Sequence, residues 1–277
     1  MKAAAIQMIS NATVDDNLAQ AEQLIQQAAK QGAQLCVLPE NFALMGDNAD
    51  ILNIAQEYTG KGRLNPGEGK FQDFLSNQAA KYGIYLVGGS IPLFSEIEHK
   101  IYSSCLVFNP QGKSNGRYNK VHLFDVQIPE KNESYQESEI FEHGKDISIF
   151  NTSFGRMNIG ICYDLRFPEL FRENDFVLLA IPAAFTQTTG EAHWEVLLRA
   201  RAIENQAYVI AANQGGKHEN GRETFGNSMI IDPWGKVLSR IEKGQGIAIA
   251  DCDFDYLYNL RKTFPVLDHR RICERFS

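Results

Sequence analysis

The pattern of apolar and polar positions alternates between strand and helix along the chain. An apolar run over residues 2–9 predicts a strand, and a stripe with helical spacing after it predicts a helix. Thr13 and Asp16 are placed as a capping box at the start of this helix, and Gly32 is suited to its C-terminal end. A second apolar stripe predicts a helix over about residues 70–82.

Two hairpins share one turn signature. The segments Asn109–Lys113 and Asp232–Lys236 both follow the pattern Asn/Asp-Pro-x-Gly-Lys between apolar runs, which predicts a β-hairpin at each. The repeat indicates two related halves, each a sheet with helices on one face. Packing two such sheets together gives an α/β fold, a four-layer α-β-β-α sandwich. Because no linker-like stretch divides the chain, we expect a single domain over residues 1–277.

Composition narrows the class of protein. A formal charge of -7 argues against a nucleic-acid partner, and no segment has the apolar length of a membrane span. The first residues turn polar too early for a signal sequence, so we expect a cytoplasmic protein. The five cysteines are odd in number and widely spread along the chain, which favours free thiols over disulfides. No two of the six histidines have the close spacing that is typical of metal ligands. We therefore expect no metal and no cofactor.

Cys162 in "MNIGICYDLRFPEL" is the first candidate for chemistry. It follows Gly160, which allows close backbone approach, and precedes Pro168, which suits the start of a helix. Backbone N–H groups and the helix dipole there are expected to lower the pKa of the thiol. On residue type alone, a cysteine in a strand is far more often a buried core residue than a reactive one, and a core position is the interpretation for Cys36.

Two charged residues also follow apolar runs. Glu40, after "VLP", is expected at a sheet edge in partly dry surroundings, where desolvation raises the pKa of a carboxyl toward that of a general base. Lys120 in "RYNKVHLFD" could favour a thiolate or hold a developing oxyanion. Taken singly, each residue also fits a solvated surface position.

The three motifs together are specific. "VLPEN", "NKVHLFD" and "GICYDLRFPEL" occur in the order Glu, Lys, Cys, and this resembles the nitrilase superfamily of carbon–nitrogen hydrolases. The resemblance runs from "AAAIQM" to "FPVLDHRR", so it covers essentially the whole chain. It implies an α-β-β-α sandwich, a small-molecule amide substrate, and assembly into a homodimer or a higher homo-oligomer.

The resemblance also implies a covalent mechanism that needs no metal. Cys162 would attack the amide carbonyl while Glu40 takes its proton, and a thioester would follow. Lys120 and the backbone N–H of Tyr163 would stabilise the oxyanion. Glu137, in "YQESEIFEHG", fits the place of a second family glutamate, which would orient Lys120 or Glu40 or assist proton transfer.

Further segments resemble a branch that hydrolyses amides of small 2-oxo acids: "AFTQTTGEAHWEVLLRARAIENQAYV", "DPWGKV" and "FPVLDHRR". The implied substrate is deaminated glutathione, cleaved to 2-oxoglutarate and cysteinylglycine; the alternative is 2-oxoglutaramate or another small amide. A substrate carboxylate calls for a cation, and Arg166 is preferred to Arg199 and Arg201, since helix arginines more often form structural ion pairs. Pocket-lining residues are expected in the loop after "LLAIPAAF": Phe185, Thr188 and Thr189.

Two other classes remain open. A Cys-His protease would pair Cys162 with His122 or His193, but it would leave Glu40 and Lys120 without a role. An interaction protein without activity would hold Cys162 as an inert, buried thiol with no cavity beside it.

Overall fold

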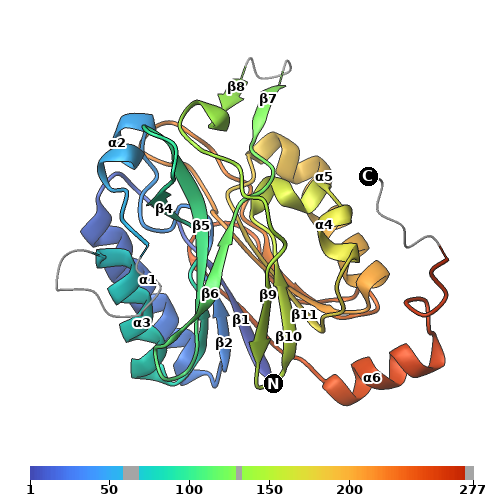
Figure 1. The fold of residues 1–277 in the computed structure, drawn as a ribbon. Helices are drawn as coiled ribbons and strands as arrows, with labels where there is room; N and C mark the ends of the chain where they lie inside the picture. The colour runs from blue at the N-terminus through green and yellow to red at the C-terminus, as the bar shows by residue number, and fades with distance from the viewer. Residues whose placement is uncertain (59–68, 129–132, 272–277) are drawn as a thin grey trace.

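Two β-sheets pack face to face between two layers of helices, which confirms the predicted four-layer sandwich (Figure 1). The structure is a computed structural model that describes the chain except for residues 59–68, 129–132 and 272–277. One outer layer consists of α1 (Val14–Lys30) and α3 (Lys70–Tyr82), and the other of α4 (Glu169–Arg172) and α5 (Gln187–Asn205). None of the described helices is long and apolar enough to cross a bilayer.

The first sheet has the order β15-β1-β2-β3-β5-β4, with β6 paired to β5. Its strands are β1 (Lys2–Gln7), β2 (Leu35–Val37), β3 (Tyr85–Val87), β4 (Ile91–Phe94), β5 (Ile101–Phe108), β6 (Ser114–Asn119) and β15 (Gly246–Asp251). Strands β1, β2 and β3 run parallel, and β15 returns from the end of the chain to pair antiparallel with β1.

The second sheet has the order β14-β13-β12-β11-β10-β9. Its strands are β9 (Ile149–Thr152), β10 (Gly155–Ile159), β11 (Leu178–Ala183), β12 (Tyr208–Asn213), β13 (Ser228–Ile231) and β14 (Val237–Ile241). Each sheet thus contains three parallel strands and one of the two predicted hairpins, β5–β6 and β13–β14. This arrangement agrees with two related halves.

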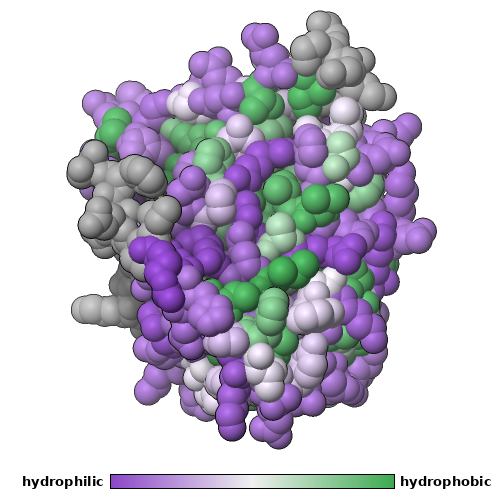
Figure 2. All heavy atoms as spheres, turned by 90° about the vertical axis from the view of Figure 1, so that its right-hand side faces the viewer, coloured by the Kyte–Doolittle hydropathy of each residue, from purple (hydrophilic) through white to green (hydrophobic). Residues whose placement is uncertain are grey.

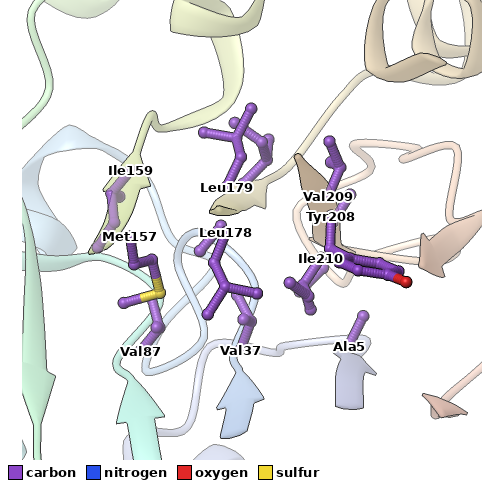
Figure 3. Packing of buried hydrophobic residues seen from close by; sticks show 14 of the residues in the cluster. Ala5, Val37, Val87, Met157, Ile159, Leu178, Leu179, Tyr208, Val209 and Ile210 are labelled. Atoms are coloured by element: carbon purple, nitrogen blue, oxygen red, sulfur yellow. The ribbon is translucent and has the colours of Figure 1, made fainter. Parts of the chain in front are cut away.

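Alternation along the strands sends side chains to opposite faces of each sheet. Ala5, Val37 and Val87 of the first sheet point toward Met157 and Leu178 of the second, and all five are fully buried (Figure 3). The intervening residues of the first sheet pack instead under α1 and α3. Burying one side chain such as a leucine stabilises the fold by about 1.5–3 kcal/mol.

The start of α1 differs from the prediction in one respect. The helix begins after Thr13 as expected, but the Thr13 side chain makes no capping hydrogen bond, so the capping box with Asp16 is wrong. The Oδ1 atom of Asn11 instead accepts from the Thr13 N–H at 2.7 Å. Gly32 adopts the predicted left-handed conformation with φ of 87°. The bounds of α3 agree with the predicted helix over 70–82.

Two further helices and one hairpin complete the fold. Helix α2 (Asn48–Asn53) was not predicted, because it is short and buries none of its residues. Strands β7 (Asp125–Ile128) and β8 (Glu133–Gln136) form a separate hairpin at the top of Figure 1. Helix α6 (Phe254–Thr263) follows β15 and lies at the base of the sandwich in Figure 1.

Candidate active site

The three motif residues follow strands and line one cavity. Glu40 lies three residues after β2, Lys120 directly follows β6, and Cys162 opens a 3₁₀ turn, Cys162–Arg166, shortly after β10. All three line a cavity of about 440 Å³, which is a size suited to a small molecule. The first and second sheets therefore both contribute to this site.

Lys120 is held between two carboxylates. Its Nζ donates to Oε1 of Glu40 at 2.8 Å and to both carboxylate oxygens of Glu137 at 2.8 Å. Oε2 of Glu137 also accepts from the Phe124 N–H at 2.6 Å. Burial by itself would lower the pKa of Lys120, but the charges of Glu137 and Glu40 outweigh it and raise that pKa. Lys120 is therefore an ammonium at neutral pH.

Cys162 is 7% exposed and has a positive φ of 49°, which is uncommon for a residue other than glycine. Burial raises the pKa of its thiol, the charge of Glu40 adds to this, and Lys120 and a backbone hydrogen bond from Ala184 oppose it. The expectation of a lowered pKa is therefore wrong, because desolvation outweighs the helix start. Since the thiol is protonated at neutral pH, a reaction at its sulfur needs a base.

Asp164, which was not predicted as a site residue, fixes the turn that carries Cys162. This fully buried carboxylate accepts from the Tyr118 hydroxyl at 2.7 Å and from the Ile161 N–H at 2.9 Å. Its other oxygen accepts from the His122 N–H at 2.9 Å and lies 2.8 Å from His122 Nδ1. Asp164 thus joins the turn that carries Cys162 to the segment that follows Lys120.

The geometry does not support the two alternatives. Neither His122 nor His193 is among the described residues that line the cavity. Nδ1 of His193 instead lies 3.2 Å from Nη1 of Arg166. An inert thiol would have no cavity beside it, whereas Cys162 lines one.

Two arginines also line the cavity. The guanidinium of Arg166 lies 5.3 Å from the Phe185 ring centroid and 5.6 Å from that of Tyr163. Arg222, which the sequence analysis missed, lies 5.4 Å from the ring centroid of Tyr135. The Nε atoms of both arginines are buried and have no hydrogen-bond partner within the described parts of the chain. Both cations are suited to an anionic ligand.

The other expected pocket residues have mixed outcomes. Phe185 and Thr189 line the cavity, whereas Thr188 is not among its lining residues. Thr188 and Thr189 also lie in the first turn of α5 rather than in a loop, because Thr186 caps that helix by accepting from the Thr189 N–H. Arg199 and Arg201 donate to backbone carbonyls outside the cavity, as expected for structural arginines.

The other three cysteines within the described residues lie outside the cavity. Four cysteines fall within the described residues and all four are free: Cys36, Cys105, Cys162 and Cys252. Cys36 is fully buried in the core as predicted, and burial raises its pKa to about 12. Cys273 lies outside the described residues. Across the part of the chain that was described, no three His, Cys, Asp or Glu side chains are arranged to hold a metal ion.

The chain is similar to known proteins over nearly its whole length. A family profile described as carbon-nitrogen hydrolase matches residues 2–262. Deaminated glutathione amidase of Synechocystis sp. is 40% identical over 273 residues, which is 97% of each chain. Omega-amidase NIT2 of Danio rerio is 41% identical over 259 residues, 92% of this chain and 89% of the relative. The crystal structure of Saccharomyces cerevisiae Nit3, described as a member of branch 10 of the nitrilase superfamily, matches with a TM-score of 0.86 and 30% identity, covering 98% of this chain and 97% of that one.

Proposed function

The chain belongs to the carbon–nitrogen hydrolase family and hydrolyses amide C–N bonds, and we propose that its substrate is the amide of a small 2-oxo acid. The observation that carries this proposal is the Lys120 ammonium, held by Glu40 and Glu137 in the cavity that Cys162 lines. Deaminated glutathione is the proposed substrate, and 2-oxoglutarate and cysteinylglycine are the products. Nearly full-length relatives named deaminated glutathione amidase support this choice.

In the proposed first half-reaction, Glu40 takes the proton of the Cys162 thiol while the sulfur attacks the amide carbon. The carbonyl oxygen becomes an oxyanion that accepts from Nζ of Lys120 and from the N–H of Tyr163. That N–H lies in the first turn of a helical segment, where backbone donors have no acceptor within the helix. One such donor contributes about 10²–10³ in kcat. Glu40 then protonates the leaving nitrogen, the C–N bond breaks, and a thioester remains.

In the second half-reaction, Glu40 takes a proton from a water that attacks the thioester carbon. The C–S bond breaks, the acid product forms, and the sulfur regains its proton from Glu40. Glu137 positions Lys120 throughout, because both of its oxygens accept from Nζ and one is itself fixed by the Phe124 N–H. Arg166 is the proposed partner of the 2-oxo-acid carboxylate.

The second candidate is an ω-amidase that releases ammonia from 2-oxoglutaramate. Omega-amidase NIT2 of Danio rerio, at 41% identity, supports it to a similar extent. Both candidates share the acyl half of the substrate and differ in the leaving group.

Release of cysteinylglycine from 2-oxoglutaryl-cysteinylglycine and of ammonia from 2-oxoglutaramate tests the proposal. We expect turnover in the wild type and none above background in Cys162→Ala or Lys120→Met. Lys81→Met is the matched control, since Lys81 forms an exposed ion pair with Glu22. Activity retained in Cys162→Ala would contradict the mechanism. Turnover of 2-oxoglutaramate alone would favour the second candidate.

We also propose a cytoplasmic location and a homodimer. Free thiols throughout the described residues suit a reducing compartment. Exposed apolar residues adjoin one another near the C-terminal end of α5. Ile203 of α5 lies beside Gly235 of the β13–β14 turn, and the ring of the neighbouring Trp234 lies 5.8 Å from that of Phe264 at the end of α6. Val196, earlier on α5, is exposed as well. Figure 2 views the molecule from the right-hand side of Figure 1, and hydrophobic residues gather in the middle of this face, with polar residues around them. A patch of this kind is suited to a second copy of the chain.

Sedimentation velocity tests the homodimer. Ile203 is 47% exposed in the chain, and Ile203→Glu should convert the dimer to a monomer, because a buried unpaired charge is costly. Ile97, which is 50% exposed elsewhere on the surface, provides the control variant Ile97→Glu. A dimer that survives Ile203→Glu would place the interface on another face.

A further inference from the structure

Three cations line the cavity, and two of them have no carboxylate partner among the described residues. Lys120 is neutralised by Glu40 and Glu137. Arg166 and Arg222 are the cations that remain for a ligand. A 2-oxo acid bound through a single carboxylate engages one of them, so the other has no role in the function proposed so far.

Arg222 is placed beside the reacting centre. Its Nη2 donates to the Ala184 carbonyl at 2.8 Å, and Ala184 lines the cavity together with Cys162. The Tyr135 ring of β8 lies 5.4 Å from its guanidinium carbon, within the range of a cation–π contact. These contacts fix the guanidinium and still leave its buried Nε without an acceptor in the described structure.

Arg166 and Arg222 approach the same short segment. Arg166 lies over the ring of Phe185, and Arg222 contacts the carbonyl of Ala184, the preceding residue. Glu139 also lines the cavity, but its Oε2 accepts from the Asn48 side chain at 2.8 Å. Two guanidinium groups that contact neighbouring residues of one segment are suited to a ligand with two carboxylates.

We propose that Arg222 binds a second carboxylate of the substrate, located in its leaving-group half. This inference rests on the proposed function and narrows it to amides whose departing amine carries a free carboxylate, as a short peptide does. Arg166 would take the 2-oxo-acid end and Arg222 the peptide end, so the scissile amide lies between two anionic anchors. 2-Oxoglutaramate has no group that reaches Arg222, because its leaving group is ammonia.

Three substrates separate these roles: 2-oxoglutaryl-cysteinylglycine, the same compound with a C-terminal amide, and 2-oxoglutaramate. We expect Arg222→Gln to lower kcat/KM for the free acid by about 10- to 100-fold, the effect of losing one charged hydrogen bond. The two substrates without the carboxylate should change by no more than about threefold, since they lack the lost contact. Arg222→Lys should recover part of the loss, whereas Arg166→Gln should impair all three substrates. Arg156→Gln, an exposed arginine at the start of β10, is the control.

An equal fall for all three substrates in Arg222→Gln would overturn the inference, because it would show that Arg222 acts only through the Ala184 segment. An unchanged kcat/KM for the free acid would overturn it as well. If the wild type hydrolyses the free acid and the C-terminal amide equally well, the inference fails and the proposed function stands. If the wild type hydrolyses none of the three, the proposed function itself fails.

Discussion

Replacing Asp164 by asparagine should loosen the turn that carries Cys162. The substitution keeps the shape of the side chain but removes its charge and turns one acceptor oxygen into an NH₂ donor. Oδ2 of Asp164 accepts from the Ile161 N–H at 2.9 Å, and an NH₂ group there would face another donor. On the other side, Oδ1 serves both the N–H and Nδ1 of His122, and a neutral amide oxygen accepts both less strongly.

The size of the effect follows from these contacts. A hydrogen bond to a charged group contributes about 1.5–3 kcal/mol, and a buried donor left unsatisfied costs about 1–3 kcal/mol. The Tyr118 hydroxyl can rotate to donate elsewhere or to accept, so its share is partly recovered. We therefore expect Asp164→Asn to lower the free energy of unfolding by about 3–5 kcal/mol. Tyr118→Phe, which removes a single donor, should lower it by about 1.5–3 kcal/mol.

Urea unfolding measures the free energies, and a double-mutant cycle measures the coupling between Tyr118 and Asp164. In parallel, kcat of Asp164→Asn should fall by about 10²-fold, because a small displacement of Cys162 impairs attack. Asp146→Asn, an exposed carboxyl, is the matched control. The reasoning is refuted if Asp164→Asn stays within about 1 kcal/mol of wild type and keeps its kcat.

Three more outcomes follow from the site. Because burial raises the pKa of Cys162, its iodoacetamide labelling rate should increase about tenfold per pH unit from pH 7 to pH 9; a plateau below pH 8 would contradict this. Glu137→Gln should lower kcat by about 10²-fold with KM nearly unchanged, since it releases Lys120 rather than substrate; a change confined to KM would exclude that role. Gly160→Ala should lower the free energy of unfolding in urea by about 1–3 kcal/mol, because its Cβ would lie 2.7 Å from the Phe171 ring; unchanged stability would show that the ring can move aside.

Glu40, Lys120 and Cys162 could be identified from the sequence because each follows an apolar run within a recognisable motif. The hairpins and α3 could be predicted for a similar reason, since turn chemistry and helical spacing are local properties. The start of α5 was harder to predict, because it depends on the cap supplied by Thr186 and not on the apolar stripe.

Asp164 and Arg222 show what local patterns do not contain. Asp164 stands inside the cysteine motif, but its function depends on Tyr118 of β6 and on His122 in the irregular segment after Lys120, both distant in sequence. Arg222 lies in an irregular polar segment between β12 and β13, where no periodicity marks one residue over its neighbours. The pKa of Cys162 is raised and not lowered as predicted, because it depends on burial, which is a property of the assembled fold.

The pairing of β15 with β1 has a consequence for synthesis. Lys2 is opposite Asp251, and the amino group of Met1 donates to the Cys252 carbonyl at 3.0 Å. A nascent chain emerging from the ribosome therefore exposes the open edge of β1 until β15 (Gly246–Asp251) has been translated. We expect this edge to be the segment that a ribosome-associated chaperone shields.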